Sequence, residues 1–196
     1  MIRILLLIIS VTLLSSELFA KDFDTNQVNV IIKNKDYGIE LRQHTNSERH
    51  HIQLERYINK WKFAYRYDKN NNKIEHRPRI DYKLYDNGKF FIKPRIEYRF
   101  YEDNRSNYGR LRSSFGLKLG NAYAEITPML HFGGNKKDDL SIDEYQSKLG
   151  YVFKVSPNTK LNTFIQHNAN KHFDKTNMLF GTNLIITFQS LIVSCL

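Results

Sequence analysis

Polar and apolar residues alternate with a period of two along most of this chain. The clearest stretch runs from residue 73 to residue 119, where residues 77–84, 93–100, 110–112 and 116–119 alternate mostly basic side chains with apolar ones. Successive side chains of a β-strand point to opposite faces, so each segment predicts a strand with one apolar and one basic face. No helical period of 3.6 residues competes with this pattern after residue 20.

Ten alternating segments follow one another along the chain. Strands are predicted at 37–45, 49–58, 61–69, 73–85, 89–102, 107–119, 121–133, 144–155, 159–168 and 177–188. Short turns at 86–88, 120–121 and 156–158 alternate with longer polar connections, as in barrels that have short periplasmic turns and longer outer loops. We therefore predict an all-β protein, a single antiparallel transmembrane β-barrel of 10–12 strands of the outer-membrane type.

The N-terminus predicts export. Residues 1–20 combine a basic start, an apolar run over 5–14 and a small residue at Ala20, which is the pattern of a secretory signal peptide. An uncleaved anchor is the alternative, although the apolar run is short for a spanning helix. Residues 21–36 are then an N-terminal arm or an extra strand, 37–188 the barrel, and 189–196 an atypical C-terminal tail. The expected location is the outer membrane of a Gram-negative bacterium.

Three prolines interrupt the predicted strands. Pro78, Pro94 and Pro128 each remove one donor from a strand ladder. Because proline in a sheet is confined to edges and bulges, we expect three β-bulges.

The composition is strongly basic, with 30 Lys and Arg against 20 Asp and Glu and a net charge of +10. Removal of residues 1–20 takes one charge of each sign and leaves this excess. Such a protein attracts anions, and export makes nucleic acid an unexpected partner. Cys195 is the only cysteine in the sequence, so no intramolecular disulfide can form.

Sorting the strands by face assigns the charged side chains to the lumen. The predicted pore-lining, substrate-binding residues are Arg42, Lys62, Arg66, Arg77, Arg79, Lys83, Lys93, Arg95, Arg99, Arg110, Arg112 and Lys118. Lys148 and Lys154 extend this set. The acids expected on the same face are fewer: Glu40, Glu55, Asp81, Glu97 and Glu125. The opposite, lipid-facing set includes Ile52, Leu54, Ile80, Ile96, Leu111, Leu149 and Leu184.

The excess of bases predicts a water-filled lumen. Each acid neutralises at most one base, and an unpaired charge is too costly to bury in a dry interior. We therefore expect an anion-selective pore. The alternative is a plugged lumen, in which the charges only pair with one another, as side chains fill small barrels.

Several segments resemble the oligogalacturonate-specific porin (KdgM-like) family of outer-membrane β-barrels. The resemblance rests on residues 39–44 and 49–55 and on residues 91–100 and 108–112, and it covers about residues 37–155. It implies a monomeric, twelve-stranded barrel whose narrow pore is lined by two basic tracks. Such a pore passes acidic oligosaccharides, for example oligogalacturonate or sialic acid. The chain departs from the family after residue 188, where two further strands would follow.

Other functions have weaker support in the sequence. An outer-membrane lipid-modifying enzyme is a less favoured alternative, because no histidine lies in a compact His-x-Ser arrangement. His50 and His51 point to opposite faces of a strand and so do not form a metal site, and we predict no catalytic residues, metal or cofactor. A non-conducting structural or adhesive barrel acting through loops such as 133–139 remains the alternative. The expected partners are acidic oligosaccharides or other small anions and outer-membrane lipid.

Overall fold

The computed structural model describes residues 25–44, 49–71, 73–103, 105–134, 142–173 and 176–188. All regular structure in these residues is β-strand. The strands are β1 (Thr25–Lys33), β2 (Tyr37–His44), β3 (Arg49–Ile58), β4 (Trp61–Asn70), β5 (Lys73–Tyr82), β6 (Tyr85–Asp86), β7 (Phe90–Tyr101), β8 (Tyr108–Leu119), β9 (Ala122–Phe132), β10 (Ile142–Ser156), β11 (Thr159–Asn170) and β12 (Thr176–Thr187). The signal peptide predicted for 1–20, the tail 189–196 and Cys195 lie outside the described residues.

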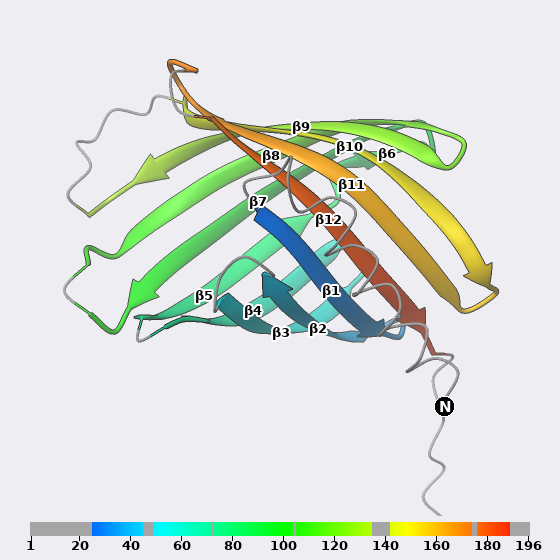
Figure 1. Ribbon diagram of the computed structural model, residues 1–196, viewed down its shortest axis with the longest axis horizontal. Helices are drawn as coiled ribbons and strands as arrows, with labels where there is room; N and C mark the ends of the chain where they lie inside the picture. The colour runs from blue at the N-terminus through cyan, green and yellow to red at the C-terminus, as the bar shows by residue number, and fades with distance from the viewer. Residues whose placement is uncertain are drawn as a thin grey trace, which may run out of the picture.

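The strands form one closed barrel (Figure 1). Their order around the wall is β5-β4-β3-β2-β1-β12-β11-β10-β9-β8-β7, and the pairing of β5 with β7 closes it. The two-residue β6 continues β5 along the same neighbour, so eleven strands make up the wall. The prediction of an all-β barrel with 10–12 strands is confirmed.

The barrel closes through a parallel pair of strands. β1 pairs antiparallel with β2 and parallel with β12, with Val28 opposite Thr182 and Val30 opposite Leu184. An odd number of strands connected by hairpins requires one parallel pair, because the first and last strands then run in the same direction. Residues 21–36 therefore contain an extra strand, one of the two options that the sequence left open.

Short connections gather at one end of the barrel, which we call the short-turn end. They join β1 to β2, β3 to β4, β6 to β7, β8 to β9 and β10 to β11. Asn59 and Gly120 adopt left-handed conformations there, with φ of 54° and 62°, as tight hairpins require. The remaining connections lie at the opposite end, the loop end, and among them only 71–72 is as short as a two-residue turn. The alternation of turns is confirmed.

Of the three bulges predicted at the prolines, those at Pro78 and Pro128 are absent, and the one at Pro94 lies in the partner strand. The register is unchanged across Pro78 and Pro128, and the ladders to β7 and β8 simply lack pairs there. Opposite Pro94 the extra residue lies in the partner strand. Asp81 pairs with Arg95 and Tyr85 pairs with Ile92. Between these two pairs the partner strand therefore advances by four residues, while β7 advances by three. A missing donor thus costs the ladder hydrogen bonds without forcing proline's own strand to bulge.

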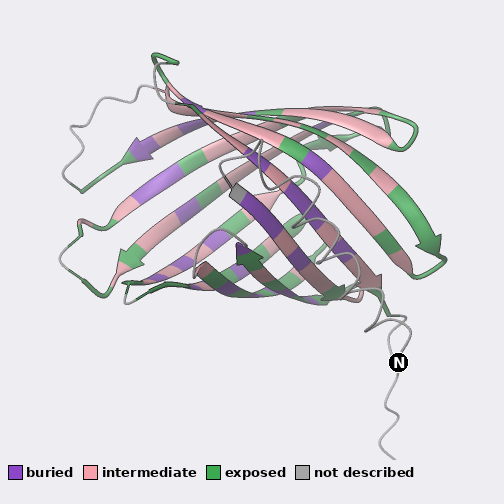
Figure 2. Cartoon of the chain, in the orientation of Figure 1, coloured by how far each residue is buried: buried purple, intermediate pink, exposed green. Residues whose placement is uncertain are grey.

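The barrel is polar inside and apolar outside. Along β3 and most of β4, exposed residues alternate with less exposed ones, and Figure 2 shows this banding on the strands. The exposed positions carry large apolar side chains such as Leu54 and Ile96, whereas buried positions hold Gln53 and Glu97. Leu184 is buried, but its neighbour Asn183 lines the cavity, so Leu184 lies on the outer face as predicted. The predicted sorting of faces holds for the apolar residues named above.

Candidate functional site

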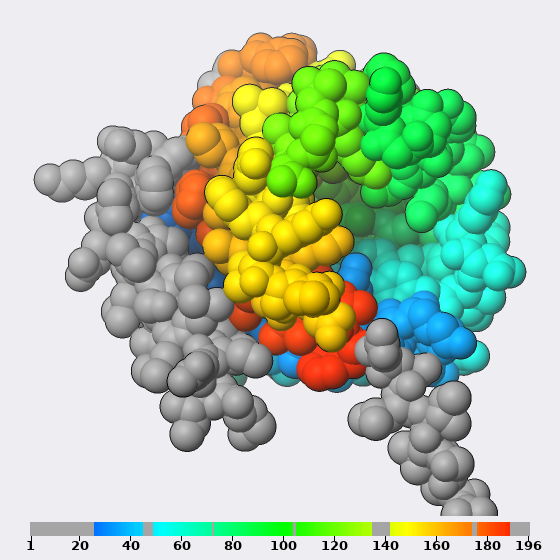
Figure 3. Space-filling view, turned by 90° about the vertical axis from the view of Figure 1, so that its right-hand side faces the viewer, coloured from blue at the N-terminus to red at the C-terminus, as the bar shows by residue number. Residues whose placement is uncertain are grey.

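The inward side chains enclose a cavity of about 630 Å³ along the barrel axis. Seen from the short-turn end, the molecular surface is hollowed at the centre of the barrel (Figure 3). The basic residues that line the cavity are Arg42, Arg49, Lys62, Arg66, Arg77, Arg79, Arg95, Arg99, Arg110, Arg112 and Lys148, and the acidic ones are Glu40, Asp68, Glu125 and Glu144. Alternation along neighbouring strands places these side chains inside because their apolar neighbours occupy the outer face.

Seven arginines on four adjacent strands form one side of the cavity, which we call the arginine wall. It consists of Arg66 on β4, Arg77 and Arg79 on β5, Arg95 and Arg99 on β7, and Arg110 and Arg112 on β8. Neighbouring strands lie only about 4.8 Å apart, so the guanidinium groups form a continuous charged surface.

Carboxylates from the same strands interleave with the arginines of this wall. Arg77 Nη2 lies 2.5 Å from Glu75 Oε1, and Arg79 Nε lies 3.2 Å from Asp81 Oδ2. Arg95 Nε also donates to Asp81. These pairs offset much of the cost of placing the charges inside the barrel.

Glu97 on β7 is the centre of the largest cluster. Its side chain is only 2% exposed, and it lies 3.6 Å from Arg99 Nη2, 3.5 Å from Arg110 Nη1 and 4.0 Å from Arg112 Nη1. Arg110 Nη2 additionally donates to Glu144 Oε2 at 2.7 Å. One carboxylate therefore serves three guanidinium groups, and Arg99 also lies 3.5 Å from Glu75 Oε1.

Arg66 has no carboxylate within 4 Å among the described residues, unlike every other arginine of the wall. Its side chain is 7% exposed, and its Nε donates to Gln53 Oε1 at 3.1 Å. Arg66 lines the cavity, where the charges that act on it are the cations Arg42, Arg77 and Arg79 and the Glu40 carboxylate. A buried guanidinium in this position needs water or an anion as its partner.

Lys148 on β10 likewise has no acidic partner within 4 Å in the part of the chain that the structure describes. Its ammonium lies 4.6 Å from the centre of the Phe164 ring, whose negative face attracts it. Phe164 in turn lies flat across Gly181, where an added Cβ would meet the ring at 2.1 Å. This aromatic–glycine pair keeps the ring against the wall.

The structure brings together nine of the twelve predicted pore-lining residues. Lys93 and Lys118 lie outside the cavity lining, toward the short-turn end, where Lys118 pairs with Asp86 at 3.1 Å. The structure contradicts the predicted lumen position of Lys83. This residue is exposed in the break between β5 and β6, where the alternation is interrupted. Lys154, from the wider set, is also exposed.

The sequence analysis underestimated how many acids enter the lumen. Asp68, Glu75 and Glu144 all pair with lumen arginines, and Arg49 belongs to the same network through Asp68 at 2.8 Å. Each lies at an even spacing from a residue already assigned inward, so extending the alternation to the strand ends would have found them. Eleven bases of the cavity stand against eight acids, so an excess of three bases remains. The acids are Glu40, Glu55, Asp68, Glu75, Asp81, Glu97, Glu125 and Glu144.

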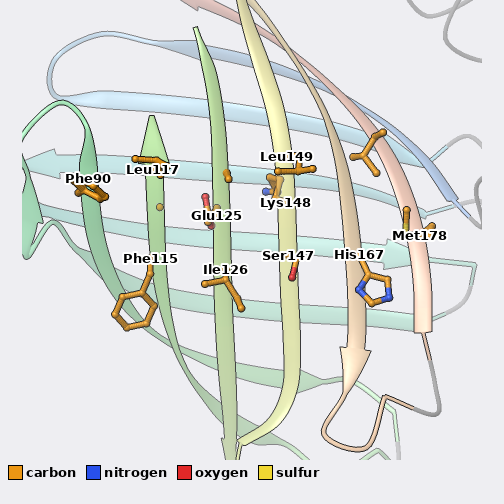
Figure 4. A pocket seen from close by; sticks show the side chains of 13 residues that line it. Phe90, Phe115, Leu117, Glu125, Ile126, Ser147, Lys148, Leu149, His167 and Met178 are labelled. Atoms are coloured by element: carbon orange, nitrogen blue, oxygen red, sulfur yellow. The ribbon is translucent and has the colours of Figure 1, made fainter. Parts of the chain in front are cut away.

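A second hollow, of about 580 Å³, lies on the outer face of β8 to β12. Figure 4 shows Phe115, Ile126 and His167 around it, while Lys148 lies behind the ribbon on the lumen side. Its lining is mainly apolar and continues the outer surface of the barrel. We therefore place the polar chemistry of this protein in the lumen.

The histidines are distributed between lumen, outer face and loops. His131 Nδ1 lies 3.3 Å from Asp143 Oδ2, whereas the Ser114 hydroxyl is engaged by Thr127 at 2.8 Å. No three His, Cys, Asp or Glu side chains of the described residues are placed to hold a metal ion.

No helix in the same part of the chain is long and apolar enough to cross a membrane. No protein-family model and no curated protein matches this chain.

Proposed function

We propose that this protein is an outer-membrane porin with a basic, anion-selective lumen that passes acidic oligosaccharides along its arginine wall. The inverted distribution of residues supports a membrane-spanning barrel. Large apolar side chains such as Leu54, Ile96 and Leu149 are 47–66% exposed, and together they cover the outer face. An apolar surface of this extent is stable only against lipid or another protein.

The observation that carries the proposal is Arg66, a buried guanidinium that faces the cavity without a carboxylate partner. Together with the excess of bases, it calls for water and mobile anions inside the barrel. Arginine suits acidic sugars because its planar fork binds a carboxylate at two positions and keeps its charge at all relevant pH values. A row of such groups passes an anion from one site to the next.

At the loop end, tyrosines extend the wall toward the outside. The rings of Tyr101 and Tyr108 lie 6.2 Å apart, Arg105 lies over Tyr101 at 3.9 Å, and Arg99 lies over Tyr108 at 5.4 Å. Aromatic rings next to guanidinium groups suit a sugar ring that bears a carboxylate. This mouth is where an acidic oligosaccharide would first meet the arginine wall.

Ion selectivity in planar lipid bilayers tests the proposal. The reversal potential under a salt gradient should show anion preference, and this preference should weaken as ionic strength rises and screens the lumen charges. Arg66→Gln should reduce it. The matched control is Lys89→Gln, the same loss of charge at an exposed turn residue outside the cavity. Cation preference in the unmodified protein would refute the proposal.

A non-conducting structural barrel is the second candidate, and the density of ion pairs favours it. Arg42, Arg77 and Arg95 all lie against carboxylates, as in a lumen filled by its own side chains. The same recordings separate the two functions. Discrete channel openings support the pore, whereas a folded barrel that never conducts supports the structural alternative.

A further inference from the structure

The lumen has a second wall, and it is uncharged. Amide side chains on four adjacent strands form it, and we call this set the amide wall: Gln27 and Asn29 on β1, Asn177 and Asn183 on β12, Gln166 and Asn168 on β11, and Gln146 on β10. Among the described residues that line the cavity from β1, β11 and β12, none is charged. The two walls therefore differ in chemistry as well as in position.

The strand order sets β12, within the amide wall, directly opposite the arginine wall, whereas at the β10 end the two walls meet, where Arg112 Nη2 donates to Gln146 Oε1 at 2.8 Å. Counting around the barrel, β12 is five strands from β5 in one direction and five strands from β7 in the other. β5 and β7 carry Arg77, Arg79, Arg95 and Arg99 into the same cavity. A solute in the lumen thus meets guanidinium groups on one side and carboxamides on the other.

The amide wall is partly held by its own hydrogen bonds. Asn168 Oδ1 accepts from Gln146 Nε2 at 2.8 Å and from Gln166 Nε2 at 2.9 Å, while Asn168 Nδ2 donates to Asn177 Oδ1 at 3.3 Å. Asn29 and Asn183 hydrogen-bond each other across the parallel seam. These bonds orient the carboxamides.

Other polar groups of the wall remain available to a solute. Gln166 Oε1 and the whole Gln27 carboxamide make no hydrogen bond with another described residue, and both side chains line the cavity. A carboxamide both donates and accepts, which is what a sugar hydroxyl also does. A carboxylate only accepts, so it gains more from the arginine wall.

We infer that the amide wall recognises hydroxyl groups and makes the pore select acidic saccharides over anions of equal charge that lack hydroxyls. The inference rests on the proposed function, since it assumes that solutes enter the lumen. A carboxylated sugar chain fits both walls at once, with its carboxylates toward Arg79 and Arg95 and its hydroxyls toward Gln27 and Gln166. A hydroxyl-free polyanion satisfies only the arginine wall and leaves the carboxamides to water.

Channel block by two solutes of equal charge tests this inference. Trigalacturonate and triglutamate, the latter with its termini blocked, each carry three carboxylates, but only the first carries sugar hydroxyls. Two hydroxyl–amide hydrogen bonds should make trigalacturonate block at about tenfold lower concentration. Equal block by both solutes would overturn the inference and leave the anion-selective pore standing. Block by neither solute, together with cation preference, would instead refute the proposed function.

Variants connect the selectivity to the amide wall. Gln27→Met with Gln166→Met keeps side-chain length and removes the free carboxamides, so the ratio of the two blocking concentrations should fall toward one. Gln43→Met, the same change at an exposed position on β2, should leave the ratio unchanged. An unchanged ratio in the double variant would also overturn the inference. Gel mobility with and without heating confirms that each variant is folded, and Gln166→Met alone serves if the double variant is not.

Discussion

An arginine at Ile96 should destabilise the barrel strongly if its outer face lies in a bilayer. Ile96 is the seventh of the twelve residues of β7 and is 47% exposed on the outer face. With a rise of about 3.4 Å per residue and a tilt near 45°, it lies roughly 15 Å along the barrel axis from Phe90. That is close to the middle of an apolar band, where arginine costs about 2–4 kcal/mol.

The matched control places the same change at a different depth. Leu119 ends β8 at the short-turn end and is 67% exposed on the same outer face. Near the bilayer interface, Leu119→Arg should cost about 0–1 kcal/mol. Urea unfolding in phosphatidylcholine vesicles measures both losses, and Trp61, the single tryptophan, provides the fluorescence signal.

The result that would refute this reasoning is specific. On a barrel whose outer face meets water, both substitutions should change the free energy of unfolding by less than about 0.5 kcal/mol. Small losses of unfolding free energy in both variants would therefore refute the proposal that the outer face lies in a bilayer. Two equally large losses would keep lipid contact and show that the assigned depths are wrong.

Two further predictions concern the lumen and the closure of the wall. Glu97→Gln should cost about 3 kcal/mol, because three guanidinium groups lose their shared carboxylate, and urea unfolding should show a smaller loss at high chloride if anions replace it. A loss that does not depend on chloride would favour a dry lumen. In a Cys195→Ser background, Val28→Cys with Thr182→Cys should form a disulfide across the parallel seam, since these residues are paired. Absence of the crosslink in folded protein, seen by gel mobility under non-reducing conditions, would argue against this closure.

The sequence by itself determined the strands and the faces of their side chains. Alternation is a local property of an extended chain, so Ile96 and Glu97 were assigned to opposite faces without knowledge of any neighbour, and the structure agrees. The same argument placed nine of the twelve predicted residues around the cavity. It failed at Lys83, where a break in the strand interrupts the period.

Only the tertiary structure decided which side chains meet. Arg66 and Arg77 belong to neighbouring strands and look equivalent in sequence, yet only Arg77 finds a carboxylate within 4 Å among the described residues. The parallel pairing of β1 with β12 likewise depends on how many strands close the wall. That closure sets β12 across from β5 and β7, and so sets amides opposite arginines. The seam between β1 and β12 joins residues 154 positions apart, such as Asn29 and Asn183, and a pattern with a period of two carries no information about such a pairing.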